Sequence, residues 1–182
     1  LRGTPTVYYA DEIGLEDVPI PPEMVQDPVE KNVPGLGLGR APERTPMQWD
    51  ASTNAGFTMG TPWLPLSADW RSRNVAAEKN GRDSVLSLYK RLIGLRQSEP
   101  ALMVGSYRAV PAEGDILAYT REHEGRRLLI VLNLGKAAHY VPLPNGGVRG
   151  RIVLCTAAGR EGEDAVGALD VQGNEGFVIE IA

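Results

Sequence analysis

The sequence predicts an α+β chain in which a strand, a long loop and a helix are followed by a small antiparallel β-sandwich. Three observations support this fold class: a β-rich run at residues 4–9, a helical repeat of apolar residues beginning at Asp83, and a series of short β-rich runs after Met103. The chain has 182 residues, 42% of them hydrophobic, which is enough for one or two folded domains. We predict domains at residues 1–100 and 101–182.

Residues 4–9 (TPTVYY) are rich in the β-branched and aromatic residue types that favour strands. Pro5 stands near the start of this run, where a missing N–H is tolerated. We therefore expect a short buried strand that leads directly into Asp11 and Glu12.

Residues 13–81 show no sustained period of 2 or 3.6, and proline and glycine recur throughout them. We expect one long loop here, with a short helix near residues 22–26. Loops longer than about 15 residues are uncommon in compact domains unless they form a binding site or are disordered. Trp49, Trp63 and Trp70 argue against disorder, so the loop is expected to carry function.

A helix is expected to begin after Asp83 as its N-cap and to end before Pro100. Its apolar residues fall at helical spacings and form one stripe, which Leu86 and Ile93 widen: Val85, Leu88, Tyr89, Leu92 and Leu95. We expect this stripe to be buried, so that replacing Leu92 with alanine would destabilise the protein by about 2 to 5 kcal/mol.

Short β-rich runs follow at residues 107–110, 116–122, 127–133, 139–143, 151–155 and 176–181, with a further candidate at 169–171. The residues between them include Glu-Gly at 113–114 and 124–125 and Pro-Asn-Gly-Gly at 144–147, which are typical of turns between antiparallel strands. Six or seven such strands in about eighty residues predict a small β-sandwich.

The composition argues against several classes of function. The net charge is −4, with acids and bases interspersed, so we expect no nucleic-acid partner. No apolar run approaches the roughly 20 residues of a membrane span, and no leader-like segment opens the sequence, so we expect no membrane association. The single cysteine, Cys155, favours a reducing compartment, and we expect the protein to be cytoplasmic. The start at Leu1, directly before an expected strand, suggests part of a longer protein.

No cofactor or metal is expected. The glycine-rich residues 34–40 (PGLGLGR) neither follow a strand nor open a helix, which argues against a phosphate cradle. His123, His139 and Cys155 show no metal-ligand spacing. The acidic residues at 161, 163 and 164 lack the alternate ligand pattern of a calcium loop and are expected to form a solvated turn.

The residues whose side chains are best suited to bind a ligand lie at 43–50 (ERTPMQWD), inside the long loop. An arginine, an amide, an indole and a carboxylate stand around a proline, and each can make directional contacts with a polyhydroxylated ligand. The alternative is that Trp49 and Met47 pin the loop while Arg44 pairs with Asp50. Spacing alone leaves both interpretations open.

A series of motifs, in order, resembles one family. Residues 3–12 (GTPTVYYADE) are followed by IPPE at 20–23, VQDP at 25–28, EKN at 30–32, PGLG at 34–37, RTPMQWD at 44–50, NAGF at 54–57 and PW at 62–63. Together they resemble the end of the catalytic barrel of the α-amylase superfamily, glycoside hydrolase family 13, in its α-glucosidase and oligo-1,6-glucosidase branch. The resemblance covers about residues 2–96 well, and the sandwich only in kind, as the family's C-terminal β domain.

The resemblance implies that residues 1–100 are the eighth strand, the long loop and the eighth helix of a TIM (β/α)8 barrel. Barrel enzymes build their sites from the loops at the carboxyl ends of the strands. Arg44 would then lie near the sugar on the leaving-group side of the scissile bond, where a guanidinium can donate to hydroxyls. Gln48, Trp49 and Asp50 would hold that wall of the substrate site.

The resemblance also implies structural roles at the site for Tyr9 and Glu12. The family usually has glycine where this chain has Ala10. A positive φ at this position would therefore be strained by roughly 1 kcal/mol.

Retaining glycosidases need two carboxyl groups about 5 to 5.5 Å apart, one as nucleophile and one as general acid. In the family these come from earlier barrel strands, and none of the corresponding motifs occurs in these 182 residues. We therefore expect no catalytic residue in this chain. It would be the C-terminal part of a retaining α-glucosidase acting on terminal bonds of short α-linked gluco-oligosaccharides, and inactive alone.

Two alternatives stay open. One is a transglycosylase or isomerase of the same superfamily, for example one like trehalose synthase. The other is a stand-alone β-sandwich that binds carbohydrate or a protein partner. A barrel fragment would also leave surfaces uncovered, through which it is expected to self-associate.

Overall fold

A computed structural model of the chain describes residues 1–144, 149–157 and 159–181. By its internal contacts the chain divides into two compact units: Leu1–Pro5 with Lys90–Ala182, which we call the β unit, and Thr6–Tyr89, which we call the loop unit. The first five residues thus group with the C-terminal part, and the division passes through helix α3. The domain boundary expected near residue 100 stays a prediction.

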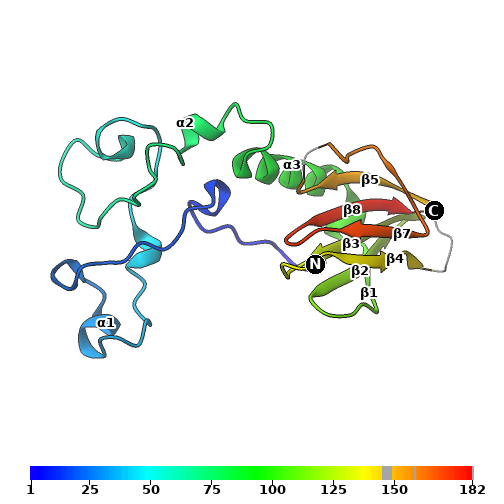
Figure 1. The fold of residues 1–182 in the computed structure, drawn as a ribbon, viewed down its shortest axis with the longest axis horizontal. Helices are drawn as coiled ribbons and strands as arrows, with labels where there is room; N and C mark the ends of the chain where they lie inside the picture. Colours follow the sequence, from blue (N-terminus) through cyan, green and yellow to red (C-terminus); the bar gives the residue numbers. More distant parts are fainter. Residues whose placement is uncertain (145–148, 158, 182) are drawn as a thin grey trace. The chain divides into compact units, whose positions relative to one another are not determined.

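The β unit is built on an antiparallel sheet (Figure 1). Its strand order among the described residues is β1-β2-β3-β8-β5-β6-β7-β4. The strands are β1 Ser106–Val110, β2 Ile116–His123, β3 Arg126–Asn133, β4 His139–Pro142, β5 Arg149–Cys155, β6 Asp164–Val166, β7 Ala168–Val171 and β8 Gly176–Ile181. All seven runs expected from the sequence form strands, so the predicted antiparallel β region is confirmed. Residues 145–147 of the turn expected at 144–147 lie outside the described residues.

The sheet encloses a hydrophobic core. Along β3 the inward residues Leu129 and Val131 are almost fully buried, and the same core includes residues from β2 to β8. The far strand β4 returns to the loop between β1 and β2, since a Cβ added at Gly114 would stand 3.1 Å from Cε1 of His139. The two ends of the strand order therefore meet around one core.

Helix α3, Val85–Ser98, is the helix predicted from the apolar repeat. Its N-terminal cap is Ser84, not Asp83, because Oγ of Ser84 accepts a 3.1 Å hydrogen bond from the backbone N–H of Ser87. A short second helix, α4 Pro100–Met103, follows it.

The expectation that the whole apolar stripe of α3 is buried is wrong for the described chain. Leu86 is buried, whereas Leu92 is 38% exposed and Ile93 45% exposed. The described residues place no element over this part of the helix, so its apolar side chains face outward. A large cost for the Leu92→Ala change is therefore not expected in this chain.

The strand expected at residues 4–9 is also wrong for the described residues, which form no strand there. The side chains of Val7, Tyr8 and Tyr9 are between 42% and 47% exposed. Residue types that favour strands are insufficient without a neighbouring strand to complete the hydrogen bonds of the ladder, and none pairs with this segment.

The loop unit is ordered around short helical turns. These are the 3₁₀ turns Asp11–Ile13, Pro22–Met24, Pro42–Arg44 and Thr53–Gly56, with helices α1 Pro28–Asn32 and α2 Val75–Glu78. The turn Pro22–Met24 lies within the short helix expected at residues 22–26. A small core of Ala10, Ile13, Met47 and Leu86 holds these turns together. In the described part of the chain, no helix has the length and apolar character needed to cross a membrane.

Candidate functional site

The segment 48–50 is fixed along its backbone on both sides. The N–H of Val75 donates to the carbonyl of Gln48, and the N–H of Ala76 to that of Trp49, each at 3.0 Å. The N–H groups of Trp49 and Asp50 both donate to the carbonyl of Ala55, at 2.9 and 3.2 Å. The segment therefore has a defined conformation within a loop that has little regular secondary structure.

Gln48 lies beneath this segment and is fully buried. Its side-chain amide nitrogen donates a hydrogen bond to the backbone carbonyl of Arg73. Its Oε1 is buried without a hydrogen-bond partner among the described residues. Gln48 thus supports the loop from inside.

Arg73 is a supporting residue that sequence reasoning missed. Its guanidinium donates to the carbonyl of Gly14 and forms ion pairs with Asp69 at 2.7 Å and Glu16 at 3.2 Å. Through Gln48 and Gly14 it joins the loop to the turn that follows Tyr9. It stands in no motif or periodic pattern, so the sequence carried no signal for it.

The Asp50 carboxylate forms hydrogen bonds within its own turn, whereas the Trp49 side chain is exposed. One carboxylate oxygen of Asp50 accepts from the N–H of Ser52 at 2.8 Å and from the Ser52 hydroxyl. These hydrogen bonds, the hydroxyl's first, lower the pKa of the Asp50 carboxyl. A Cβ at Gly56 would stand 2.9 Å from these oxygens, so only glycine leaves room for them. Trp49 is 51% exposed and presents its indole at the surface.

Arg44 is paired with Asp27, not with Asp50. Its Nη1 lies 3.9 Å from Oδ2 of Asp27, and its side chain is 43% exposed. Asp27 caps α1 by accepting a 2.8 Å hydrogen bond from the N–H of Val29. The N–H of Arg40, then that of Val29, lowers the pKa of the Asp27 carboxyl, and Arg44 adds to this effect. The guanidinium therefore lies within ion-pair distance of Asp27 while much of it stays accessible.

The alternative interpretation, that hydrophobic side chains pin the loop while Arg44 pairs with Asp50, is correct for Met47 and wrong for the Arg44–Asp50 pair. Met47 is 7% exposed and belongs to the small core, so it does pin the loop. The pairing of Arg44 with Asp50 that this interpretation required is not found in the described structure.

Tyr9 and Glu12, for which the sequence predicts structural roles, stand on either side of the turn at Ala10. Ala10 has φ 73, which confirms the strained backbone expected where the family has glycine. The Tyr9 hydroxyl donates a 3.0 Å hydrogen bond to the carbonyl of Thr45. Burial raises the pKa of Tyr9, with Tyr8 adding to the effect and Arg44 opposing it. Glu12 has one carboxylate oxygen buried without a hydrogen-bond partner among the described residues, so its structural role stays a prediction.

A second turn, at residues 54–60, follows the segment 48–50 in the chain. The side-chain amide of Asn54 donates to the carbonyls of Thr58 at 3.1 Å and Gly60 at 2.7 Å. Met59 lies between them and is fully exposed at the tip.

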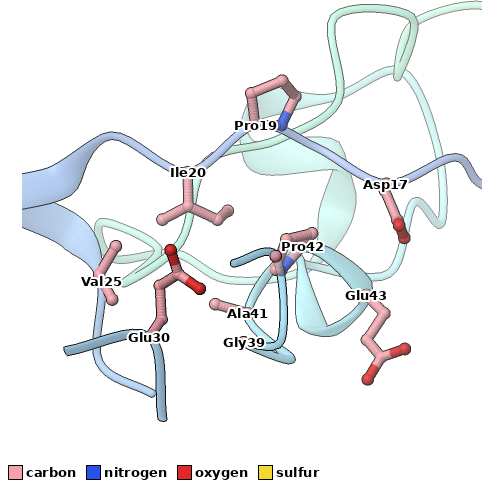
Figure 2. Close-up of a pocket in the computed structure, with 10 residues that line it drawn as sticks. Asp17, Pro19, Ile20, Val25, Glu30, Gly39, Ala41, Pro42 and Glu43 are labelled. Atoms are coloured by element: carbon pink, nitrogen blue, oxygen red, sulfur yellow. The ribbon is translucent and has the colours of Figure 1, made fainter. Parts of the chain in front are cut away.

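The loop unit is hollowed beside Glu43. One hollow of about 450 Å³ is lined by Ile20, Glu30, Ala41 and Glu43, among others. Figure 2 shows the Glu30 carboxylate pointing toward Ile20, whereas Glu43 points away. A smaller hollow of about 190 Å³ includes Tyr9 and shares Glu43 with the first. The walls combine apolar surface with carboxylates, which suits contact with hydroxyl groups.

These residues can bind a polar ligand but are poorly suited to donate a proton. Lowered pKa values keep Asp27 and Asp50 ionised near neutral pH, so their oxygens accept hydrogen bonds. Arg44 offers donors and Trp49 an apolar ring face. Over the described ranges, no group of three or more His, Cys, Asp or Glu side chains is arranged to hold a metal ion.

The amino-acid sequence is similar to known glycosidases. Residues 1–105 match the family model described as alpha amylase, catalytic domain. An oligo-1,6-glucosidase of Parageobacillus thermoglucosidasius is 33% identical over 164 residues, covering 80% of this chain and 29% of that protein. A glucan 1,6-alpha-glucosidase of Streptococcus pneumoniae is 30% identical, covering 87% of this chain and 32% of that protein.

Solved structures show the same relationship in three dimensions. A trehalulose synthase from Pseudomonas mesoacidophila MX-45 matches 100% of this chain with a TM-score of 0.87 and 30% identity. An isomaltulose synthase from Klebsiella sp. LX3 matches 79% of it with a TM-score of 0.74 and 30% identity. The chain spans 36% of the first structure and 26% of the second.

Proposed function

This chain belongs to the α-amylase catalytic-domain family, in its α-glucosidase branch, and on that basis we propose that it is the C-terminal part of a retaining α-glucosidase. The proposed reaction is hydrolysis of terminal α-glucosidic bonds in short oligosaccharides. The observation that carries the proposal is the family match over residues 1–105, which includes both Arg44 and the segment 48–50, whose backbone is fixed by hydrogen bonds.

In this proposal, residues 1–100 supply the end of a (β/α)8 barrel and residues 101–182 a β-sandwich domain. The exposed apolar side chains support it, since Val7 is 47% exposed and Ile93 45% exposed. Such side chains would be covered when neighbouring barrel strands and helices are present.

Arg44 and Trp49 are the proposed substrate contacts. The guanidinium of Arg44 would donate hydrogen bonds to sugar hydroxyls, and the indole of Trp49 would lie against an apolar sugar face. Gln48 and Asp50 would hold this wall in shape, as their bonds to Arg73 and Ser52 support.

The general acid and the nucleophile are proposed to lie in earlier barrel strands. A glycosidase's general acid needs a raised pKa, whereas the pKa values of Asp27 and Asp50 are lowered. The chain by itself is therefore proposed to be inactive. We also propose a cytoplasmic location, on the single cysteine of the sequence.

The test is to express the complete reading frame and assay glucose release from isomaltose and isomaltotriose. We expect turnover by the complete protein and none by the 182-residue chain. A complete protein that binds these sugars at millimolar concentration without turnover would instead support the stand-alone binding module.

A second candidate function is isomerisation by transfer within the same family. It is favoured by the solved structures of trehalulose and isomaltulose synthases and by that of a MutB mutant in complex with the substrate sucrose. Hydrolysis and transfer share a covalent glycosyl intermediate and differ in which acceptor reaches it. Chromatography of the products from sucrose separates the two: glucose with fructose indicates hydrolysis, and an isomeric disaccharide indicates transfer.

A further inference from the structure

A hollow of about 450 Å³ lies in the β unit, between strand β4 and the loop that joins β1 to β2. Pro111 and Glu113 line it from the loop, and His139 and Tyr140 line it from the strand, among others. Its described lining residues all belong to the β unit, so one unit supplies the whole site. We call it the β4 hollow. Its volume falls within the range of about 300 to 1,000 Å³ that is typical of small-molecule sites.

The imidazole of His139 fixes the spacing between the two walls of the β4 hollow. It packs against Gly114 in the loop, where an added Cβ would stand 3.1 Å from Cε1 of His139. Gly114 also has φ 62, a backbone conformation that side chains other than glycine rarely adopt. The loop can therefore lie this close to β4 only because residue 114 is glycine.

Tyr140 differs from the other aromatic residues of the β unit in its exposure. Phe177 is 1% exposed, Tyr119 is 5% exposed, and the ring of Tyr107 packs on that of Tyr119 with 5.1 Å between the centroids. Tyr140 is 72% exposed, although burial of an aromatic ring normally stabilises a fold. Its ring face is therefore accessible to a ligand that enters the β4 hollow.

The backbone of Tyr140 adds a hydrogen-bond donor and an acceptor. Strand β4 ends the strand order of the described residues and pairs with β7 on its other side. Further along this ladder, the N–H of Leu143 donates a 2.9 Å hydrogen bond to the carbonyl of Gly167 opposite. Residues of an antiparallel pair alternate between bonded and non-bonded positions, so the N–H and C=O of Tyr140 point away from β7. Both groups therefore stand at the free edge of β4.

A free strand edge can also pair with a strand of another chain, but β4 is poorly suited to that role. Pro142 has the same orientation in the ladder as Tyr140 and carries no N–H. Within β4 the free edge thus offers the N–H of Tyr140 as its donor, and a proline on an edge strand discourages further pairing. A small ligand needs only a few directional contacts, whereas an added strand needs a ladder.

We propose that the β4 hollow is a binding site for glucose units along an α-glucan chain. A pyranose ring has an apolar C–H face and a rim of hydroxyl groups, and the hollow matches both. The ring of Tyr140 lies against the apolar face, while the Glu113 carboxylate accepts hydrogen bonds from hydroxyls and the N–H of Tyr140 donates one. His139 adds a ring nitrogen at the same wall. The choice of a glucan as the ligand rests on the proposed function.

The test is affinity electrophoresis of the complete protein in native gels that contain dextran, an α-1,6-linked glucan. Long dextran chains present few ends, so retardation in the gel reports mainly binding along the chain. We expect Tyr140→Ala and Glu113→Gln to raise the dissociation constant for dextran by about five- to tenfold. Tyr140→Phe keeps the ring and is expected to bind within about twofold of wild type.

The matched control is Glu124→Gln. Like Glu113, Glu124 precedes a glycine between two strands, and its side chain is 86% exposed, but it does not line the β4 hollow. We expect wild-type retardation from this variant. Equal retardation of wild type, Tyr140→Ala and Glu113→Gln would overturn the proposal. If Tyr140→Ala does not fold, Glu113→Gln decides, because it preserves the size of the side chain.

Turnover of isomaltose by the same variants separates this proposal from the proposed function. We expect kcat/KM to change less than about twofold, since Arg44 and Trp49 are intact. Loss of dextran binding in Tyr140→Ala would support the β4 hollow even if the complete protein is no glucosidase. Unchanged dextran binding beside normal turnover would overturn the hollow alone. In sedimentation velocity without sugar, a dimer that Tyr140→Ala abolishes would assign the hollow to a second copy of the chain and overturn the sugar site.

Discussion

The hydroxyl of Tyr9 donates a 3.0 Å hydrogen bond to the carbonyl oxygen of Thr45, across 36 positions of sequence. Thr45 is 1% exposed, so water cannot easily replace the tyrosine. This bond joins the turn at Ala10 to the residue directly after Arg44. The position of the proposed substrate contact therefore depends on a side chain that has no direct role toward substrate.

Tyr9→Phe should destabilise the protein, because it leaves the buried carbonyl of Thr45 without this donor. The expected cost is about 1 to 3 kcal/mol in the free energy of unfolding, measured by denaturant titration of the complete protein. Tyr140→Phe is the matched control, since Tyr140 is 72% exposed on β4. Equal stability of the two variants would contradict a structural role for the Tyr9 hydroxyl.

Arg44→Ala should reduce kcat/KM for isomaltose while leaving the fold intact. Hydrogen bonds from charged donors contribute about 1.5 to 3 kcal/mol, so the expected loss is about 10- to 100-fold. Arg40→Ala is the control, because Arg40 contacts Asp27 through its backbone N–H. Unchanged kinetics with Arg44→Ala would remove the main proposed contact.

The stabilising effect of the Asp27 charge should depend on pH. The folded-state pKa of Asp27 is lowered from its ordinary value of 3.8, chiefly by the Arg40 N–H, so the stabilisation is present above that value and is lost as pH falls through the folded-state pKa. We expect the difference in Tm between wild type and Asp27→Asn to be largest near pH 6 and to shrink below about pH 4. The exposed Asp17, replaced by asparagine, serves as control, and a difference that grows on acidification would contradict this sign.

Leu86→Ala should cost more stability than Leu92→Ala in the 182-residue chain. Leu86 is 8% exposed in the small core, where truncation of a leucine typically costs about 2 to 5 kcal/mol. Leu92 is 38% exposed, and we expect a cost below about 1 kcal/mol. Denaturant melts of both variants test the ranking, and a rise in the Leu92 cost in the complete protein would show that further segments cover this face.

Much of the β unit could be predicted because its information is local. Strands such as β3, a run of apolar and β-branched residues that follows a Glu-Gly turn, can be predicted from strand composition and turn chemistry. The family resemblance was likewise confirmed by the match over residues 1–105, because eight short motifs in one order are far more specific than any single one.

The failures depended on non-local contacts. The strand expected at residues 4–9 needed a partner strand, which no local pattern supplies. Of the three acidic residues expected in a solvated turn, Asp164 instead begins strand β6, Asp164–Val166, because the pairing of this strand with β5 uses backbone groups that the side chains do not reveal. The cap of α3 moved by one residue to Ser84, whose hydroxyl contacts the carbonyls of Glu78 and Gly81 as well.

At the candidate site, the sequence predicted which residues take part but not their contacts. The segment around Arg44 and the strained Ala10 were both anticipated. The pairing of Arg44 with Asp27 and the support from Arg73 depend on how the loop folds back on itself, which motif spacing does not encode.

The exposed turn held by the Asn54 side chain contains a methionine whose oxidation reports how accessible this surface is to solvent. Met59 at its tip is fully exposed, whereas Met47, twelve positions earlier, is 7% exposed. Peroxide oxidises accessible thioethers first, so the ratio of sulfoxide at these two methionines reports whether anything covers the turn. A single peptide map of the complete protein, with and without sugar, would thus report on this surface without any introduced label.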